Sequence, residues 1–103
     1  MQPHPYQIRP QAEADLDHHA RAIAQDNLEA ALRLYDQAKT TCEMLADMPK
    51  MSAMHHTGKP ELMGIRYMPI TGFPRYLVFY KSLDGGVDIL RILHDRMDRD
   101  GWF

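Results

Sequence analysis

The chain is poor in cysteine and lacks a long apolar run. Cys42 is the only cysteine, which excludes an intrachain disulfide and is typical of a protein kept in a reducing cytoplasm. Uninterrupted apolar stretches are only a few residues long, whereas a membrane-spanning helix needs about 20. The first residues lack a basic segment followed by an apolar one, so we expect no signal peptide. These absences predict a cytoplasmic protein that does not enter a membrane.

A strong basic excess is also missing. The chain carries 12 lysines and arginines against 14 acidic residues, a net charge of −2. Residues 11–49 hold eight acidic and three basic residues, whereas the remainder holds nine basic and six acidic ones. A protein that grips RNA mainly through its phosphates usually has a large positive excess. The charge therefore argues against that mode of binding.

The first half of the chain shows helical periodicity. Residues 6–9 alternate in polarity and end at Pro10, which predicts a short strand. Two amphipathic helices are expected next, because apolar residues recur every three or four positions in 11–25 and again in 28–48. Asp26 and Glu29 are spaced as a capping box for the second helix, and Pro49 should end it. The two helices form a helical hairpin.

The second half reads as β-structure. Residues 50–63 have no clean period and contain Gly58 and Pro60, so we expect a loop. Strands are predicted at 64–70, 75–80 and 87–93, joined by turns at 71–74 and 84–86, with 87–93 central. The fold class is therefore α+β. One domain over 1–103 has an N-terminal strand, a helical hairpin packed on one face of the sheet and a three-stranded antiparallel meander, followed by a charged tail at 95–103.

Several short motifs, in this order and spacing, resemble the RelE/ParE toxin superfamily over almost the whole chain. The motifs are Tyr6-x-Ile8-x-Pro10, residues 12–16 (AEADL), 26–31 (DNLEAA), 45–49 (LADMP), 75–80 (RYLVFY) and 87–94 (VDILRILH). The resemblance implies the fold expected above and a growth-inhibiting toxin of a type II toxin–antitoxin system, of the kind that stabilises plasmids. It also implies neutralisation by an antitoxin encoded beside it, and it allows a toxin–antitoxin hetero-oligomer.

The ending Arg91-x-Leu93-His94, with a charged extension after it, is similar to the ParE branch, whose members poison DNA gyrase. Poisoning requires binding rather than bond-breaking, so this reading implies no catalytic residues and no cofactor. Arginine and tryptophan are the residue types most enriched at interface hot spots. By this resemblance, gyrase contacts are expected at Arg91, His94, Arg96, Arg99 and Trp102. Trp102 and Phe103 could instead fold back over the sheet edge.

The alternative from the enzyme class is a RelE-like, ribosome-dependent mRNA endoribonuclease. Its catalytic set would be Arg75, His94 and Arg96, because 2′-hydroxyl attack needs a base and cations that stabilise the phosphorane. Two features argue against it: Trp102 cannot exchange a proton as tyrosine can, and the strand at 64–69 holds only Arg66 as a basic residue. A third reading is an inactive toxin fold that only binds its antitoxin.

Further expectations concern the remaining side chains. The antitoxin should contact apolar residues of the second helix and beyond, namely Leu32, Tyr35, Met48, Met51 and Met54. We favour core packing over groove lining for the methionines Met44, Met48, Met51, Met54, Met63 and Met68. Cys42 should be a buried structural thiol. The pairs 18–19 and 55–56 of histidines have poor geometry for a metal, so exposed polar positions are the better interpretation.

Overall fold

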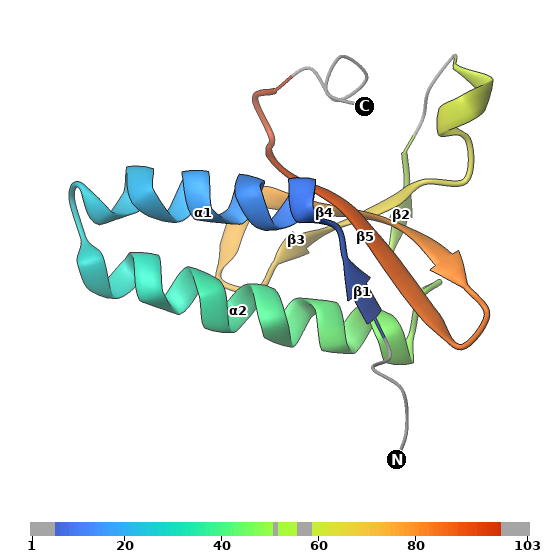
Figure 1. Ribbon diagram of the computed structural model, residues 1–103, viewed down its shortest axis with the longest axis horizontal. Coiled ribbons are helices and arrows are strands. Elements are labelled where there is room, and N and C mark those ends of the chain that lie inside the picture. The colour runs from blue at the N-terminus through green and yellow to red at the C-terminus, as the bar shows by residue number, and fades with distance from the viewer. Residues whose placement is uncertain (1–5, 51, 56–58, 98–103) are drawn as a thin grey trace.

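A computed structural model describes residues 6–50, 52–55 and 59–97 of the chain. Figure 1 shows a short strand, two long helices and a sheet. In chain order the elements are β1 (Tyr6–Ile8), α1 (Pro10–Ala24), α2 (Leu28–Asp47), β2 (Ala53–Met54), the 3-10 helix η1 (Pro60–Leu62), β3 (Arg66–Ile70), β4 (Phe73–Leu83) and β5 (Gly86–His94).

The helices begin where the sequence predicted, but one cap differs. Pro10 occupies the first turn of α1, where its missing N–H is tolerated. The cap of α2 is Asn27 rather than Asp26: Asn27 has extended backbone (φ −155°), and its side-chain oxygen accepts the N–H of Ala30. The backbone N–H groups of Asp26 and Asn27 both bond to the carbonyl of Ile23, so Asp26 still belongs to the end of α1.

The sheet is mixed, with strand order β1-β5-β4-β3-β2. β1 pairs with β5 in parallel, whereas all other neighbours are antiparallel. β1 therefore adds a parallel edge strand to the predicted antiparallel meander, because the helical hairpin returns the chain as a crossover connection between β1 and the later strands. β4, not 87–93, is the middle strand. The region expected to be only a loop contains β2 and η1.

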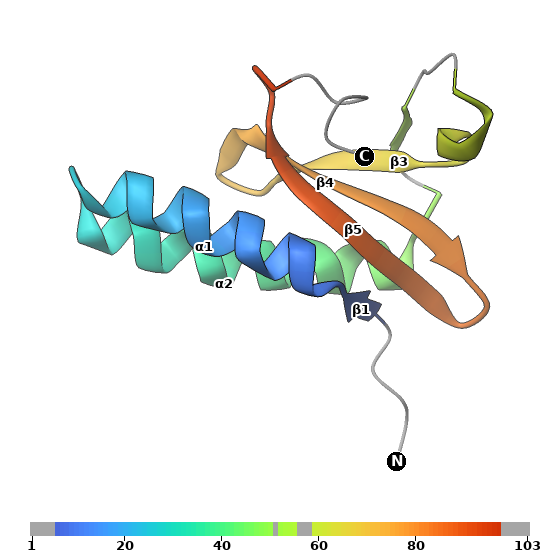
Figure 2. The same ribbon diagram turned by 45° about the horizontal axis from the view of Figure 1, so that its top comes forward.

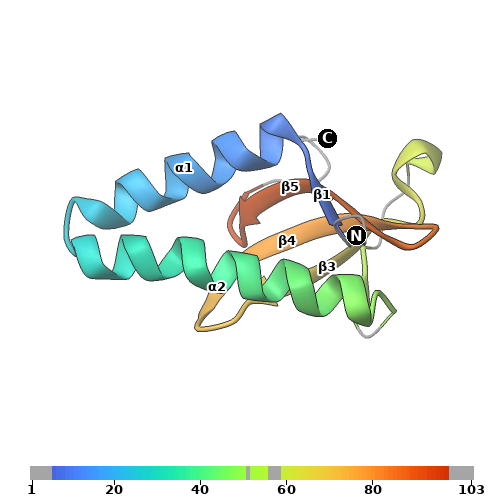
Figure 3. The ribbon, with the colours of Figure 1, turned by 60° about the horizontal axis from the view of Figure 1, so that its bottom comes forward.

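Both helices lie on the same side of β3, β4 and β5, as Figures 2 and 3 show. The main core lies between them and the sheet and includes Leu16, Leu34, Leu45, Val78 and Ile89. This confirms the predicted packing of the hairpin on one face. No helix within the described ranges combines the length and hydropathy needed to cross a membrane.

The opposite face of the sheet is also covered. Leu62 and Ile65, from η1 and the residues after it, pack there on Leu77, Phe79 and Leu90 in a second core. Residues 87–93 of β5 are consequently buried without interruption. Burial along a whole strand is expected when both faces of a sheet are covered, and the two charged residues within it, Asp88 and Arg91, are ion-paired.

A bulge interrupts the ladder between β4 and β5. Phe79 pairs with Arg91 and Tyr80 pairs with Ile89, so Leu90 is the extra residue. Bulges bend a strand and change the direction of a side chain locally. Here the bulge changes the face of the sheet toward which the Arg91 side chain points.

Candidate functional site

The register of β4 and β5 gathers polar side chains where these strands end. Tyr76 pairs with His94, and the backbone N–H of Asp95 bonds to the carbonyl of Arg75 at 2.7 Å. The Asp95 carboxylate lies 3.8 Å from Arg75 Nη1 and 3.1 Å from His94 Nδ1. Arg75, Tyr76, His94, Asp95 and Arg96 form what we call the strand-end cluster. The three residues of the alternative catalytic set therefore do lie together.

The His94 ring is held on two sides. Its Nδ1 accepts the backbone N–H of Arg96 at 3.1 Å, and the ring packs edge-on against Tyr76, with centroids 5.1 Å apart. Its side chain is 25% exposed, whereas that of Arg75 is 62% exposed. A binding partner could therefore contact Arg75 and Arg96 over most of their side chains, and the imidazole of His94 only in part.

A second histidine continues this stack into the core. The His19 ring packs on Tyr76 from the other side, at 4.9 Å, and its Nε2 lies 2.8 Å from the carbonyl oxygen of Ile92. Desolvation lowers the pKa of His19, although the bond to the carbonyl opposes that shift. His55 is buried too, with its ring against Phe79. The expectation that these histidines are exposed is wrong, because α1 and the 52–55 segment both turn them onto the sheet.

Arg91 is mostly covered. Its Nε and Nη2 donate to the two carboxylate oxygens of Asp15, each at 2.7 Å, and Asp15 also accepts the backbone N–H of Ile92. The side chains are 10% and 13% exposed, and the bond to Asp15 raises the pKa of Arg91. The pair ties α1 to β5. Target contact by Arg91 stays a prediction, limited by this burial.

The predicted target contacts Arg99 and Trp102, and the fold-back of Phe103, lie outside the described residues. Arg96 is exposed at the described end of the chain. Among the described residues, no group of three histidine, cysteine or acidic side chains is placed to hold a metal ion.

An apolar patch lies on the outside of the helical hairpin. Leu28, Leu32 and Tyr35 share one side of α2 at helical spacing and are 64%, 57% and 38% exposed. We call these three residues the hairpin patch. The Tyr35 hydroxyl donates to Asp17 of α1 at 2.7 Å, and this bond raises the pKa of Tyr35. Leu28 was missed from the sequence, although its spacing to Leu32 and Tyr35 was the available signal.

The methionines are not mainly core. Met48, Met54 and Met63 are 57%, 39% and 67% exposed, so the core interpretation is wrong for them. Met48 leaves the helical path because α2 ends at Asp47, which removes it from the buried stripe. Met68 does pack against the core, and Met51 lies outside the described residues.

Cys42 is 2% exposed, and burial raises the pKa of its thiol to about 12. A thiol with such a pKa is almost entirely protonated at neutral pH and is a poor nucleophile. The predicted structural role is confirmed.

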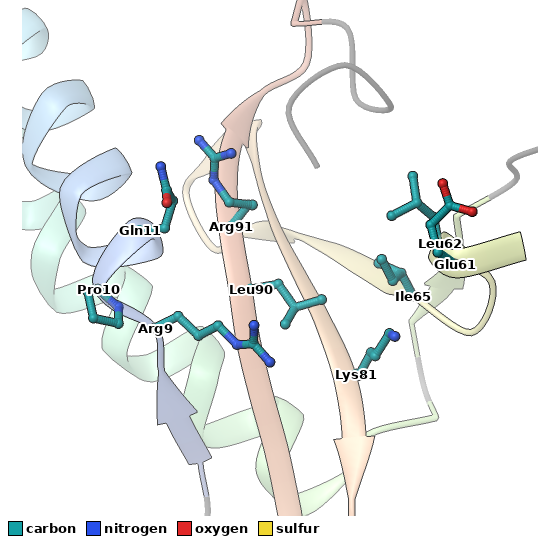
Figure 4. Close-up of a pocket in the computed structure, with 9 residues that line it drawn as sticks. All are labelled: Arg9, Pro10, Gln11, Glu61, Leu62, Ile65, Lys81, Leu90 and Arg91. Atoms are coloured by element: carbon teal, nitrogen blue, oxygen red, sulfur yellow. The ribbon is translucent and has the colours of Figure 1, made fainter. Parts of the chain in front are cut away.

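A groove of about 590 Å³ runs beside β5, between the start of α1 and η1 (Figure 4). We call it the sheet-face groove; its lining residues are Arg9, Pro10, Gln11, Glu61, Leu62, Ile65, Lys81, Leu90 and Arg91. They come from four separate segments, so sequence reasoning had no signal for it.

Comparison with known proteins agrees with this fold. A family model described as the ParE toxin of the type II toxin–antitoxin system parDE matches residues 6–99. A chain of the chromosomal ParDE TA system from P. aeruginosa is similar in structure, with a TM-score of 0.67 and 19% identity over 86% of this chain and 92% of that chain. No curated protein sequence matches the chain. Because the family model spans nearly all of the described residues, the chain belongs to the ParE toxin family of type II toxin–antitoxin systems.

Proposed function

We propose that this toxin inhibits DNA gyrase, and hence replication, and that a cognate antitoxin neutralises it. Membership of the ParE family supports the proposal. The observation that carries the choice between gyrase and the ribosome is the position of Asp95 inside the strand-end cluster.

Asp95 weakens the cluster as a nuclease site. RNA cleavage needs uncompensated cations around the phosphorane, because its extra negative charge develops there. The Asp95 carboxylate lies within 4 Å of both Arg75 and His94 and offsets the positive charge of Arg75. In addition, His94 Nδ1 already accepts the Arg96 N–H, so this nitrogen has no free lone pair for the proton of a 2′-hydroxyl.

The same arrangement suits protein binding. Exposed Arg75 and Arg96 flank the partly exposed ring of His94, which rests on Tyr76. Arginines beside an aromatic surface are common in interface hot spots. We assign gyrase contact to His94 and Arg96. Arg91, and Arg99 and Trp102 outside the described residues, stay proposed contacts.

The direct test is supercoiling and DNA cleavage by purified gyrase with the purified toxin. Wild type should inhibit supercoiling and stabilise cleaved DNA. Arg96→Glu should weaken the effect by about tenfold or more, since charge reversal at an interface disfavours binding. Arg33→Glu, the same charge change on an exposed position of α2, should act as wild type does. Unchanged supercoiling and cleavage at large toxin excess would refute the gyrase proposal.

A second candidate, the ribosome-dependent ribonuclease, is favoured by one observation: Arg75, His94 and Arg96 do meet in space. RNA-end mapping on translating ribosomes discriminates it. New cleavage that depends on His94 would establish the enzyme. If strong expression without antitoxin leaves growth unaffected, the chain is an inactive toxin fold.

The antitoxin is proposed to bind the hairpin patch, with Met48, Met51 and Met54 as further contacts. Exposed leucines at helical spacing favour the apolar face of a partner helix. Residues 11–49 carry eight acidic side chains, so basic residues on that partner would complement them.

A further inference from the structure

The sheet-face groove has an aliphatic floor. Leu90 lies at its base, and Leu62 and Ile65 form the wall opposite α1 (Figure 4). All three side chains are at most 9% exposed and belong to the second core. A ligand that fills the groove would therefore bury its own apolar group on an already rigid surface.

The bulge in β5 shapes this groove. Successive residues of a regular strand point to opposite faces, yet Leu90 and Arg91 both line the groove. The register shift opposite Phe79 and Tyr80 accounts for this. An apolar floor and a cation consequently lie side by side.

Arg9 is better exposed than the acid that pairs with it. It donates to both oxygens of Asp88, but the arginine side chain is 59% exposed and the aspartate only 12%. Arg91 and Asp15 are both covered, at 10% and 13% exposed. Lys81 projects beside Ile65, across the strand pair from Asp88. Glu61 is the one acidic residue of the lining.

We propose that the sheet-face groove binds a segment of the antitoxin in which acidic residues flank a leucine or isoleucine. The carboxylates would meet Arg9 and Lys81, and the aliphatic side chain would pack on Leu90 between them. A nucleic acid fits less well, because its phosphates gain nothing from contact with the aliphatic floor and are repelled by the carboxylate of Glu61. The inference rests on the proposed function, since it assigns a second contact surface to the same partner.

The test measures association of the purified toxin with the full-length protein encoded beside its gene, at low and high salt. Lys81→Glu should slow association about tenfold at low salt, and Glu61→Lys should accelerate it, because rim charges act mainly on the association rate. Both differences should shrink at high salt as the charges are screened. Arg96→Glu changes the net charge as Lys81→Glu does, but in the strand-end cluster rather than on a surface proposed for the antitoxin, and should bind the neighbouring protein as wild type does.

Melting curves of each variant establish that it is folded before binding is measured. Equal association rates for wild type, Lys81→Glu and Glu61→Lys would overturn the groove assignment while leaving the antitoxin proposal intact. If wild type itself fails to bind the neighbouring protein, the antitoxin proposal fails, and the groove assignment fails with it.

Discussion

At the scale of single residues, two buried polar contacts connect α1 to β5: His19 with the carbonyl of Ile92, and Asp15 with Arg91. Both sites replace water with a specific partner: the carbonyl of Ile92 for His19 and a guanidinium for Asp15. A buried polar group that loses its partner costs more than the bond contributed, because its desolvation is no longer compensated. These residues should therefore govern stability more than their small number implies.

The first prediction concerns pH. Burial lowers the pKa of His19 in the folded state, so the unfolded chain, where the pKa is near 6.5, binds more protons as pH falls below that value. Folding stability should then decrease on acidification from about pH 6.5 down to the folded pKa, with a slope of at most about 1.4 kcal/mol per pH unit.

Urea unfolding of wild type and His19→Gln between pH 5 and 8 measures this slope. The variant should lose less stability on acidification, because it lacks the buried imidazole whose pKa desolvation lowers. Parallel pH profiles for the two proteins would contradict the assignment.

The second prediction concerns the ion pair. Asp15→Ala removes two charge-assisted hydrogen bonds from the largely buried Arg91 and the acceptor of the Ile92 N–H, and we expect a loss of about 3 kcal/mol in the free energy of unfolding. Glu13→Ala, two residues earlier on α1 and exposed, should change stability by less than about 0.5 kcal/mol. Denaturant titration of both variants measures these losses. Equal free energies of unfolding for Asp15→Ala and Glu13→Ala would show that the Asp15–Arg91 pair is not important for stability.

At the scale of elements, the local patterns are accurate, whereas the pairing of β1 with β5 was not predicted. The periodicity of apolar residues placed α1, α2, β3, β4 and β5 within a few residues of their observed bounds, and the turn at Gly85 has the expected positive φ of 78°. The two-residue strand β2 and the short 3-10 helix η1 were not predicted, because segments this short have no period to detect.

The third prediction tests the corrected start of α2. Asn27→Ala removes the side-chain acceptor of the Ala30 N–H and should cost about 1 kcal/mol of stability. Asp26→Ala should be nearly neutral, because Asp26 is not the capping residue. Thermal melts of the two variants give the comparison, and the reverse order would restore the capping box inferred from the sequence.

At the scale of the molecule, the hairpin patch and the strand-end cluster involve different elements. The patch lies on the outer side of α2, whereas the cluster lies where β4 and β5 pair at Tyr76 and His94. If each surface serves one partner, toxicity and neutralisation can be separated by mutation. Mutations far apart with no shared contacts act nearly independently.

The fourth prediction follows from that separation. Leu32→Ser should leave toxicity intact but weaken antitoxin binding by about tenfold or more, since it removes an exposed apolar anchor. Arg96→Glu should do the opposite. Growth assays with and without co-expressed antitoxin, together with binding measurements, test both variants. Loss of toxicity in Leu32→Ser, with the protein still folded, would show that the two surfaces overlap.

The sequence by itself determined the α+β class, the order of helices and main strands, the burial of Cys42 and the family resemblance. Each of these depends on residues near one another in the chain, where backbone geometry fixes the period of apolar side chains. The candidate residues Arg75, His94 and Arg96 also came from such local motifs.

Tertiary structure alone decided the parallel pairing of β1 with β5, the burial of His19 and Arg91, the exposure of Leu28 and Met48, and the groove. Arg9 meets Asp88 across 79 positions, and Arg91 meets Asp15 across 76. No local pattern records such a meeting. Such contacts arise because the helical hairpin folds back over the sheet. The packing of two segments distant in the sequence then determines which polar groups are removed from water.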